Sequence, residues 1–312
     1  MTLSWAIAHK MTMMVASKAH RDTGVDRGEY VDVFAALQAA GVCCVAKPLR
    51  GLAGAYAAPP LGGPAVLLNS RLDELTMRHT AAHELGHHVL GHDSTTDERA
   101  DPDRANLGGS WPDEEKLAET FAAWFLMPLP AVRTAIRRAG IGSPAKPEDV
   151  HQIACWLGTT FAGTARHLVN LRILAPDRAA TLVGEWRARN PAIRAALCGS
   201  AVPPPGRVWV MRPEASPAFL HVIQGDTLLY PGGAAPGPLP AGLVMRSDPQ
   251  LSLDPGAAVV VTAALTRATD LAIQSADGNA EIAITLIPPP ERSGIDTAWR
   301  PRGEQPRPHL ET

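Results

Sequence analysis

The motif HELGH at residues 83–87 constrains the fold of this 312-residue chain more than any other feature. Residues four apart lie on one face of an α-helix, so His83 and His87 can present two imidazole nitrogens to one metal ion. Glu84 lies beside them and can take a proton from a water molecule that the metal activates. We therefore expect a helix over about residues 75–90, ended by Gly91, with a metal site on one face.

A catalytic zinc ion needs a third protein ligand and a fourth position that is open to water. The extended pattern HExxHxxGxxH would place glycine and histidine where this chain has Leu90 and Asp93, so that route fails by one residue. His92 and Asp93 follow the helix end and would reach the metal only if the chain folded straight back. His79 shares the ligand face one turn before the motif, where we expect it to pack or to support a ligand.

The next predicted helix, over about residues 114–126, offers a carboxylate. Glu115 shares a face of that helix with alanines three and seven residues later, and small side chains let two helices approach closely. This pattern favours Glu115 as the third ligand. Glu114 and Glu119 stay open as alternatives, because acidic residues in a first turn also stabilise a helix that only faces solvent.

Composition and charge narrow the class of protein. Hydrophobic residues make up 46% of the chain and charged residues 19%, which is typical of a globular protein. The 29 basic and 31 acidic residues nearly cancel, so direct DNA binding is not expected. The four cysteines form no CxxC pair, and the apolar stretch at residues 3–8 is too short for a secretory signal or a membrane span. We therefore expect a cytoplasmic protein without membrane contact.

Proline-rich stretches at residues 144–147 and 203–205 divide the chain. Before the first, helical patterns flank a β-like region in which residues 65–68 are a strand candidate and residues 51–56 are loose and glycine-containing. Between the two stretches the pattern is helical, and after the second it changes to six short β-rich runs separated by turns. We predict an α+β protein with an N-terminal domain, a helical block, an all-β barrel or sandwich and a disordered tail, at residues 1–143, 144–200, 204–288 and 289–312.

Two segments resemble the ImmA/IrrE family of metallopeptidases: TAAHELGHH at residues 80–88 and EKLAETFAAWFLMP at residues 115–128. In that family a TxAHELGH helix is followed roughly thirty residues later by the pattern ExxANxFAxxLLMP. This chain departs from the pattern at Glu119, where the family usually has asparagine, and at Phe125, where it has leucine. The resemblance covers about residues 25–130.

The resemblance implies a zincin-like N-terminal peptidase domain that binds Zn²⁺ through His83, His87 and Glu115, with Glu84 as the general base. It also implies an endopeptidase that cleaves a specific regulatory protein, a helix-turn-helix transcriptional repressor, and so acts in transcription regulation. The helical block at residues 148–174 is similar to a block in some family members; its Ala-x-x-x-Gly spacing suits a helix-turn-helix, although helix packing explains the same spacing. The β-rich region has no counterpart in the family.

Three questions stay open at this level. The first concerns function: the alternative to an endopeptidase is a non-proteolytic, zinc-containing regulatory protein that acts through the helix-turn-helix-like block, and the intact Glu84 argues against it. In a further reading the chain is a peptidase, and the β-rich domain is the sensor that gates it through a ligand or partner. Tyr56 and His88 are candidates for stabilising the oxyanion that forms during peptide hydrolysis. The strand at residues 65–68 is either an edge to which an extended substrate adds or a part of the core.

Overall fold

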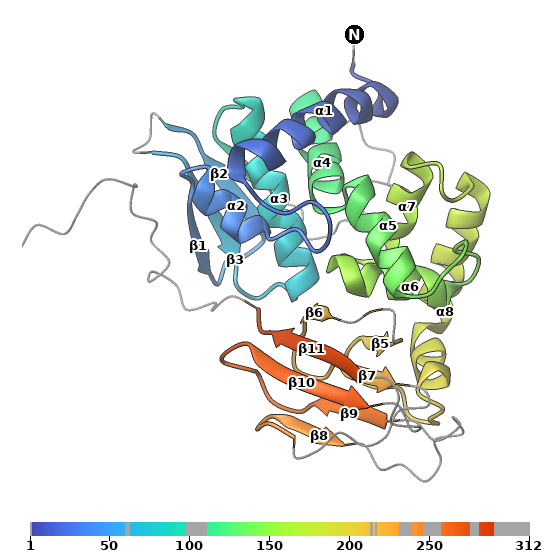
Figure 1. Ribbon diagram of the computed structural model, residues 1–312. Coiled ribbons are helices and arrows are strands. Elements are labelled where there is room, and N and C mark those ends of the chain that lie inside the picture. Colours follow the sequence, from blue (N-terminus) through green and yellow to red (C-terminus); the bar gives the residue numbers. More distant parts are fainter. Residues whose placement is uncertain are drawn as a thin grey trace, which may run out of the picture. The chain divides into compact units, whose positions relative to one another are not determined.

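The computed structural model describes residues 2–59, 63–97, 111–212, 215, 217–230, 239–245, 257–274 and 281–289. These residues contain eight helices and three small sheets, which confirms the predicted α+β class (Figure 1). They divide into two compact units, of which the first contains residues 2–26 and 31–126 and the second residues 27–30 and 127–289. The domain boundaries predicted from the sequence stay predictions.

The first unit combines four helices with a four-stranded sheet. Its helices are α1 (Trp5–Thr23), α2 (Val33–Ala39), α3 (Glu74–Leu90) and α4 (Asp113–Leu126), and its strands are β1 (Cys43–Lys47), β2 (Gly54–Ala57), β3 (Ala65–Asn69) and β4 (Thr95–Asp97). The strand order is β1-β3-β2-β4; β1 runs parallel to β3, and β2 runs antiparallel to both β3 and β4. α3 lies against β2 and β3, and α4 packs against both α3 and α1 (Figure 1).

The helix α3 is a core helix with defined ends. The carboxylate of Asp73 accepts hydrogen bonds from the backbone N–H groups of Leu75 and Thr76, which caps the N-terminus. Gly91 ends the helix in the left-handed conformation, with φ of 71°. Every residue from Thr80 to His87 is buried, so packing fixes this stretch on all sides. The helix predicted around the HELGH motif is thereby confirmed.

The strand β3 lies inside the sheet, between β1 and β2. Its residues pair with β1 along one side and with β2 along the other. Val66 and Leu68 are buried in the core. The prediction that this strand offers an edge to an extended substrate is therefore wrong, and its core role is confirmed. The β-like region predicted from the sequence also contains β2, which begins at Gly54 in the stretch that looked loose.

The second unit begins with four helices, α5 (Leu129–Arg138), α6 (Pro147–Leu157), α7 (Phe161–Asn170) and α8 (Pro176–Leu197). Its described strands form one sheet with the order β10-β11-β6 and another with the order β5-β7-β9-β8. Their bounds are Val208–Val210 (β5), Ala218–His221 (β6), Thr227–Tyr230 (β7), Leu243–Met245 (β8), Ala257–Val261 (β9), Thr269–Gln274 (β10) and Glu281–Ile287 (β11). All six predicted β-rich runs contain strands, but β10 was missed. The barrel or sandwich stays a prediction.

Two further expectations concern the predicted disordered tail and membrane contact. Residues 290–312, nearly all of the predicted disordered tail, lie outside the described residues. Within them, no helix combines the length and the apolar character that crossing a membrane requires.

Candidate metal centre

Three side chains from α3 and α4 converge on one point. His83 and His87 lie one turn apart on α3, and their Nε2 atoms are 3.1 Å from each other. Glu115, in the first turn of α4, places Oε2 3.2 Å from Nε2 of His83 and Oε1 3.6 Å from Nε2 of His87. The ligand atoms that these residues offer all lie within 4.8 Å of one another. We call these three residues the metal cluster.

The metal cluster has the dimensions and the chemistry of a zinc site. Zinc bonds of about 2.0–2.2 Å in a tetrahedron keep neighbouring ligand atoms roughly 3.3–3.6 Å apart. The 3.1 Å between the two Nε2 atoms, and the 3.2 and 3.6 Å from these atoms to Oε2 and Oε1 of Glu115, are close to this range. Two imidazole nitrogens and one carboxylate oxygen are also a donor set that zinc accepts in catalytic sites, with a fourth position left for water. The residues therefore fit zinc.

The electrostatics of the cluster also suit a cation. Burial lowers the pKa of His83, but its contacts with Glu115 and Glu119 and the charge of Glu84 outweigh burial and hold that pKa well above its usual value. Burial and the neighbouring His83 lower the pKa of His87 to about 3, against the opposing charge of Glu115. The surroundings thus stabilise one positive charge among buried groups, which is the condition that a bound cation needs.

A glycine and an alanine bring the two helices together. A Cβ atom added to Gly86 of α3 would lie 3.0 Å from Cδ1 of Phe121 and 3.2 Å from Cα of Ala118. Ala118 is itself fully buried. Larger side chains at either position would separate α3 from α4 and draw Glu115 away from the histidines. The close helix approach that the alanine spacing predicted is present.

The alternative third ligands lie elsewhere. Glu119 faces the opposite side of the His83 ring, with Oε2 3.6 Å from Nδ1. Glu114 and Asp93 are exposed. His92 lies behind the other imidazole, where its Nδ1 atom is 2.9 Å from Nδ1 of His87. Among the candidates weighed from the sequence, the structure brings Glu115 alone to the facing Nε2 atoms.

Glu84 is fully buried and follows His83 directly on α3. Its carboxylate lies beneath strand β2: a Cβ atom added to Gly54 would be 2.8 Å from Oε1 of Glu84 and 2.6 Å from Cγ2 of Thr80. Glycine at this strand position therefore makes room for the Glu84 carboxylate. Sequence reasoning missed Gly54, and the only signal for it was a glycine inside a β-like stretch.

Tyr56 and His88 contact each other near the cluster. The Tyr56 hydroxyl is 3.1 Å from Nδ1 of His88, and the Tyr56 ring stacks on His87 at a centroid distance of 6.5 Å. Burial raises the pKa of the Tyr56 hydroxyl and lowers the pKa of His88. Both groups are therefore neutral near pH 7 and can act as hydrogen-bond partners.

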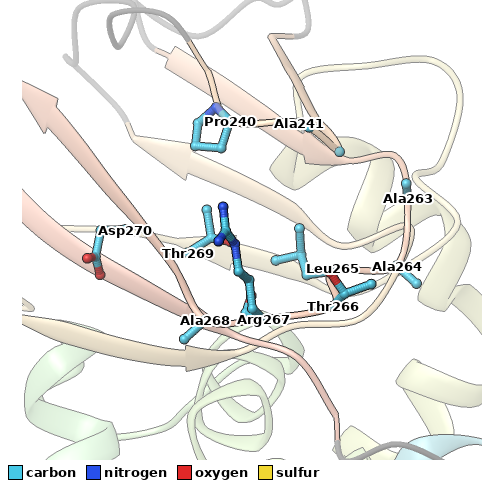
Figure 2. A pocket seen from close by; sticks show the side chains of 11 residues that line it. Pro240, Ala241, Ala263, Ala264, Leu265, Thr266, Arg267, Ala268, Thr269 and Asp270 are labelled. Carbon is cyan, nitrogen blue, oxygen red and sulfur yellow. The ribbon is translucent and has the colours of Figure 1, made fainter.

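A hollow of different character lies in the β-rich region, with a volume of about 790 Å³. Figure 2 shows the Arg267 side chain extending between Leu265 and Thr269, with Asp270 at the rim. Arg267 and Asp270 are exposed, and most of the remaining lining residues are small. These side chains do not converge on one point, so the hollow lacks the feature that marks the metal cluster.

Comparison with known proteins agrees with the site. Residues 46–140 match the family model of the IrrE N-terminal-like domain, a peptidase family, and both motifs lie within this match. No curated protein matches the chain. The resemblance read from residues 80–88 and 115–128 is thus confirmed, because both segments lie in the part of the chain that is similar to the IrrE N-terminal-like peptidase domain.

Proposed function

We propose that this protein is a zinc-dependent endopeptidase that hydrolyses a peptide bond in a specific regulatory protein. His83, His87 and Glu115 hold the metal. The observation that carries this proposal is the convergence of their ligand atoms at 3.1–3.6 Å on two closely packed helices. The match to a peptidase family supports hydrolysis of a peptide bond as the reaction.

Zinc held by His83, His87 and Glu115 would supply Lewis acidity, which would bring the pKa of a water molecule down to about 7. The carboxylate of Glu84 accepts the proton of that water as its oxygen bonds to the peptide carbonyl carbon. Glu84 then delivers the proton to the leaving nitrogen as the C–N bond breaks. The burial of Glu84 against Gly54 supports this role, because packing holds the carboxylate in one orientation.

The developing oxyanion needs a further hydrogen-bond donor. Tyr56 and His88 are the proposed candidates. Their support is the stacking of Tyr56 on His87 and its hydrogen bond to His88, which place both beside a proposed ligand. We favour Tyr56, because a neutral hydroxyl can turn from His88 to an oxyanion without a change of charge.

The family resemblance supports a helix-turn-helix transcriptional repressor as the substrate, and with it a role in transcription regulation. The helix-turn-helix-like block of this chain, a cytoplasmic location and the absence of direct DNA binding stay part of the proposal. If a gene beside this one encodes a helix-turn-helix repressor, that repressor is the first substrate to test, and a proteome-derived peptide library serves as an unbiased second.

The variant Glu84→Gln tests the proposal. Gln cannot accept the proton, so cleavage should fall by about 10²- to 10⁴-fold, while the zinc content measured by mass spectrometry stays at one per chain. The exposed neighbour variant Glu114→Gln removes the same charge and should cleave at the wild-type rate. Wild-type protein that holds zinc yet cleaves neither substrate favours the non-proteolytic alternative. Full activity of Glu84→Gln excludes the proposed mechanism.

A further inference from the structure

A second carboxylate lies behind the metal cluster, between two histidines of α3. Oε2 of Glu119 is 2.9 Å from Nε2 of His79 and 3.6 Å from Nδ1 of His83. The two histidines are one turn apart on α3, and Glu119 projects from α4. The side chains of His79 and Glu119 are only 24% and 19% exposed, so solvent screens their interaction weakly.

The two ring nitrogens of His83 therefore face different partners. Nε2 faces His87 and Glu115, whereas Nδ1 faces Glu119. An imidazole that binds a metal through Nε2 must carry its proton on Nδ1, and a carboxylate beside Nδ1 stabilises that tautomer and the ring orientation. At 3.6 Å the contact is electrostatic rather than a full hydrogen bond, so it depends on how firmly Glu119 is held.

His79 holds Glu119. Its Nε2–H donates to the carboxylate at 2.9 Å, which is within the normal range for a hydrogen bond to a charged acceptor. Without that donor, the Glu119 side chain would be free to rotate away from Nδ1 of His83. This contact explains a glutamate at a position where the ImmA/IrrE pattern usually has asparagine, because His79 is a hydrogen-bond partner for the additional negative charge.

We propose that His79 and Glu119 are positioning residues that fix the Nδ1–H tautomer and the orientation of His83 for metal binding. The pair acts through His83 and makes no contact with the substrate. This inference rests on the metal cluster of the proposed function and deepens it, because it assigns the groups that set the affinity of the site for zinc.

Zinc affinity of the purified full-length chain, measured by competition with a chromophoric chelator, tests the pair. Glu119→Ala should weaken zinc binding by about 10- to 100-fold, the usual range for loss of a group that supports a metal-bound histidine. Glu119→Gln keeps an oxygen that can accept from Nδ1 and should restore most of the affinity. His79→Ala should weaken binding by less than Glu119→Ala. The absorption bands of bound Co²⁺ should shift in Glu119→Ala, because the ring orientation of His83 changes.

Matched variants separate this role from general effects of charge or folding. Glu114 lies on the same helix and is exposed, so Glu114→Ala and Glu114→Gln should bind zinc as the wild type does. His83→Ala should abolish tight binding. If Glu119→Ala has the zinc affinity and the Co²⁺ spectrum of the wild type, the positioning role is overturned. The zinc site itself is still supported in that case if His83→Ala loses the metal. Equal losses of zinc affinity in Glu119→Ala and Glu114→Ala also overturn the positioning role. A wild-type chain that binds no zinc overturns both proposals.

Discussion

The two units each bury a polar cluster, and the two clusters differ in how their atoms are satisfied. In the second unit, Asp226 is fully buried and accepts from the backbone N–H of Arg207 at 2.9 Å, from its guanidinium at 2.6 Å and from the backbone N–H of Ile223 at 3.0 Å. Its oxygens are thus surrounded by donors. In the metal cluster of the first unit, ligand atoms of His83, His87 and Glu115 face one another.

Burial of polar groups alone therefore does not mark a functional site. A carboxylate whose neighbours all donate hydrogen bonds stabilises the fold and has no capacity left for a ligand. A group of side chains whose lone pairs point at one another is stable only with a cation or a proton among them. The difference between Asp226 and Glu115 is one of partners, because both are acidic side chains in packed surroundings.

Of the variants that distinguish the two clusters, Asp226→Asn should have the largest effect, and this effect is on stability. Loss of the carboxylate leaves the guanidinium of Arg207 without its charge partner, which should lower the free energy of unfolding by about 3–5 kcal/mol. Zinc affinity should not change. Urea unfolding and chelator competition measure the two quantities.

The control for this variant is Asp270→Asn. Asp270 is exposed and accepts from Thr285, so its replacement should cost less than about 0.5 kcal/mol. A zinc affinity that falls in Asp226→Asn would break the comparison, because it would tie the structural cluster of the second unit to the metal cluster.

A smaller effect is expected from Gly54→Ala. The added methyl would come within 2.8 Å of Oε1 of Glu84 and must displace it or strand β2. We expect kcat to fall by about 10- to 100-fold, as for a proton acceptor that is moved from its position, with zinc still bound. Gly142→Ala is the control, since a Cβ there meets nothing within 4 Å. Wild-type kcat in Gly54→Ala would refute the assigned position of the general base.

The smallest expected effect is on how the stability of the second unit depends on pH. Burial, reinforced by the charges of Arg207 and Arg194, lowers the pKa of His151 to about 3, and its Nε2 accepts from the backbone N–H of Val208. The unfolded chain takes up a proton at this histidine below its ordinary pKa of 6.5, whereas the folded chain does so only near 3. Between these values the unfolded state binds more protons, so stability falls as pH falls.

His151→Gln removes this titration. Between pH 7.5 and pH 5, the variant should lose about 2 kcal/mol less unfolding free energy than the wild type. Urea unfolding at both pH values gives the difference. Above pH 7.5 the two stability curves should run parallel. Parallel curves down to pH 5 would contradict the burial of a neutral His151.

The α3 half of the site was predictable because local periodicity determines it. The i,i+4 spacing of His83 and His87 and the break at Gly91 are properties of one helix. Glu115 followed from the next helix, since its shared face with small residues anticipated the close approach that Gly86 and Ala118 permit.

Other features of the fold and the site depend on contacts between helices and strands, which cannot be read from a single sequence. The strand β2 was missed because Gly54 weakens the strand pattern, although the structure needs glycine there to make room for Glu84. The role of Glu119 required knowledge that His79 and His83 both face it across the helix pair. The strand β10 was missed although Leu271 and Ile273 alternate with exposed residues, which is a pattern the sequence did contain.

X-ray absorption at the zinc edge tests the central claim most directly. Wild-type protein should give a first shell of two imidazole nitrogens and two oxygens at about 2.0–2.2 Å, one oxygen from Glu115 and one from water. His87→Ala should lose one imidazole from that shell or lose the zinc altogether. A shell that contains sulfur, or one that is identical in wild type and His87→Ala, would contradict the assignment of zinc to His83, His87 and Glu115.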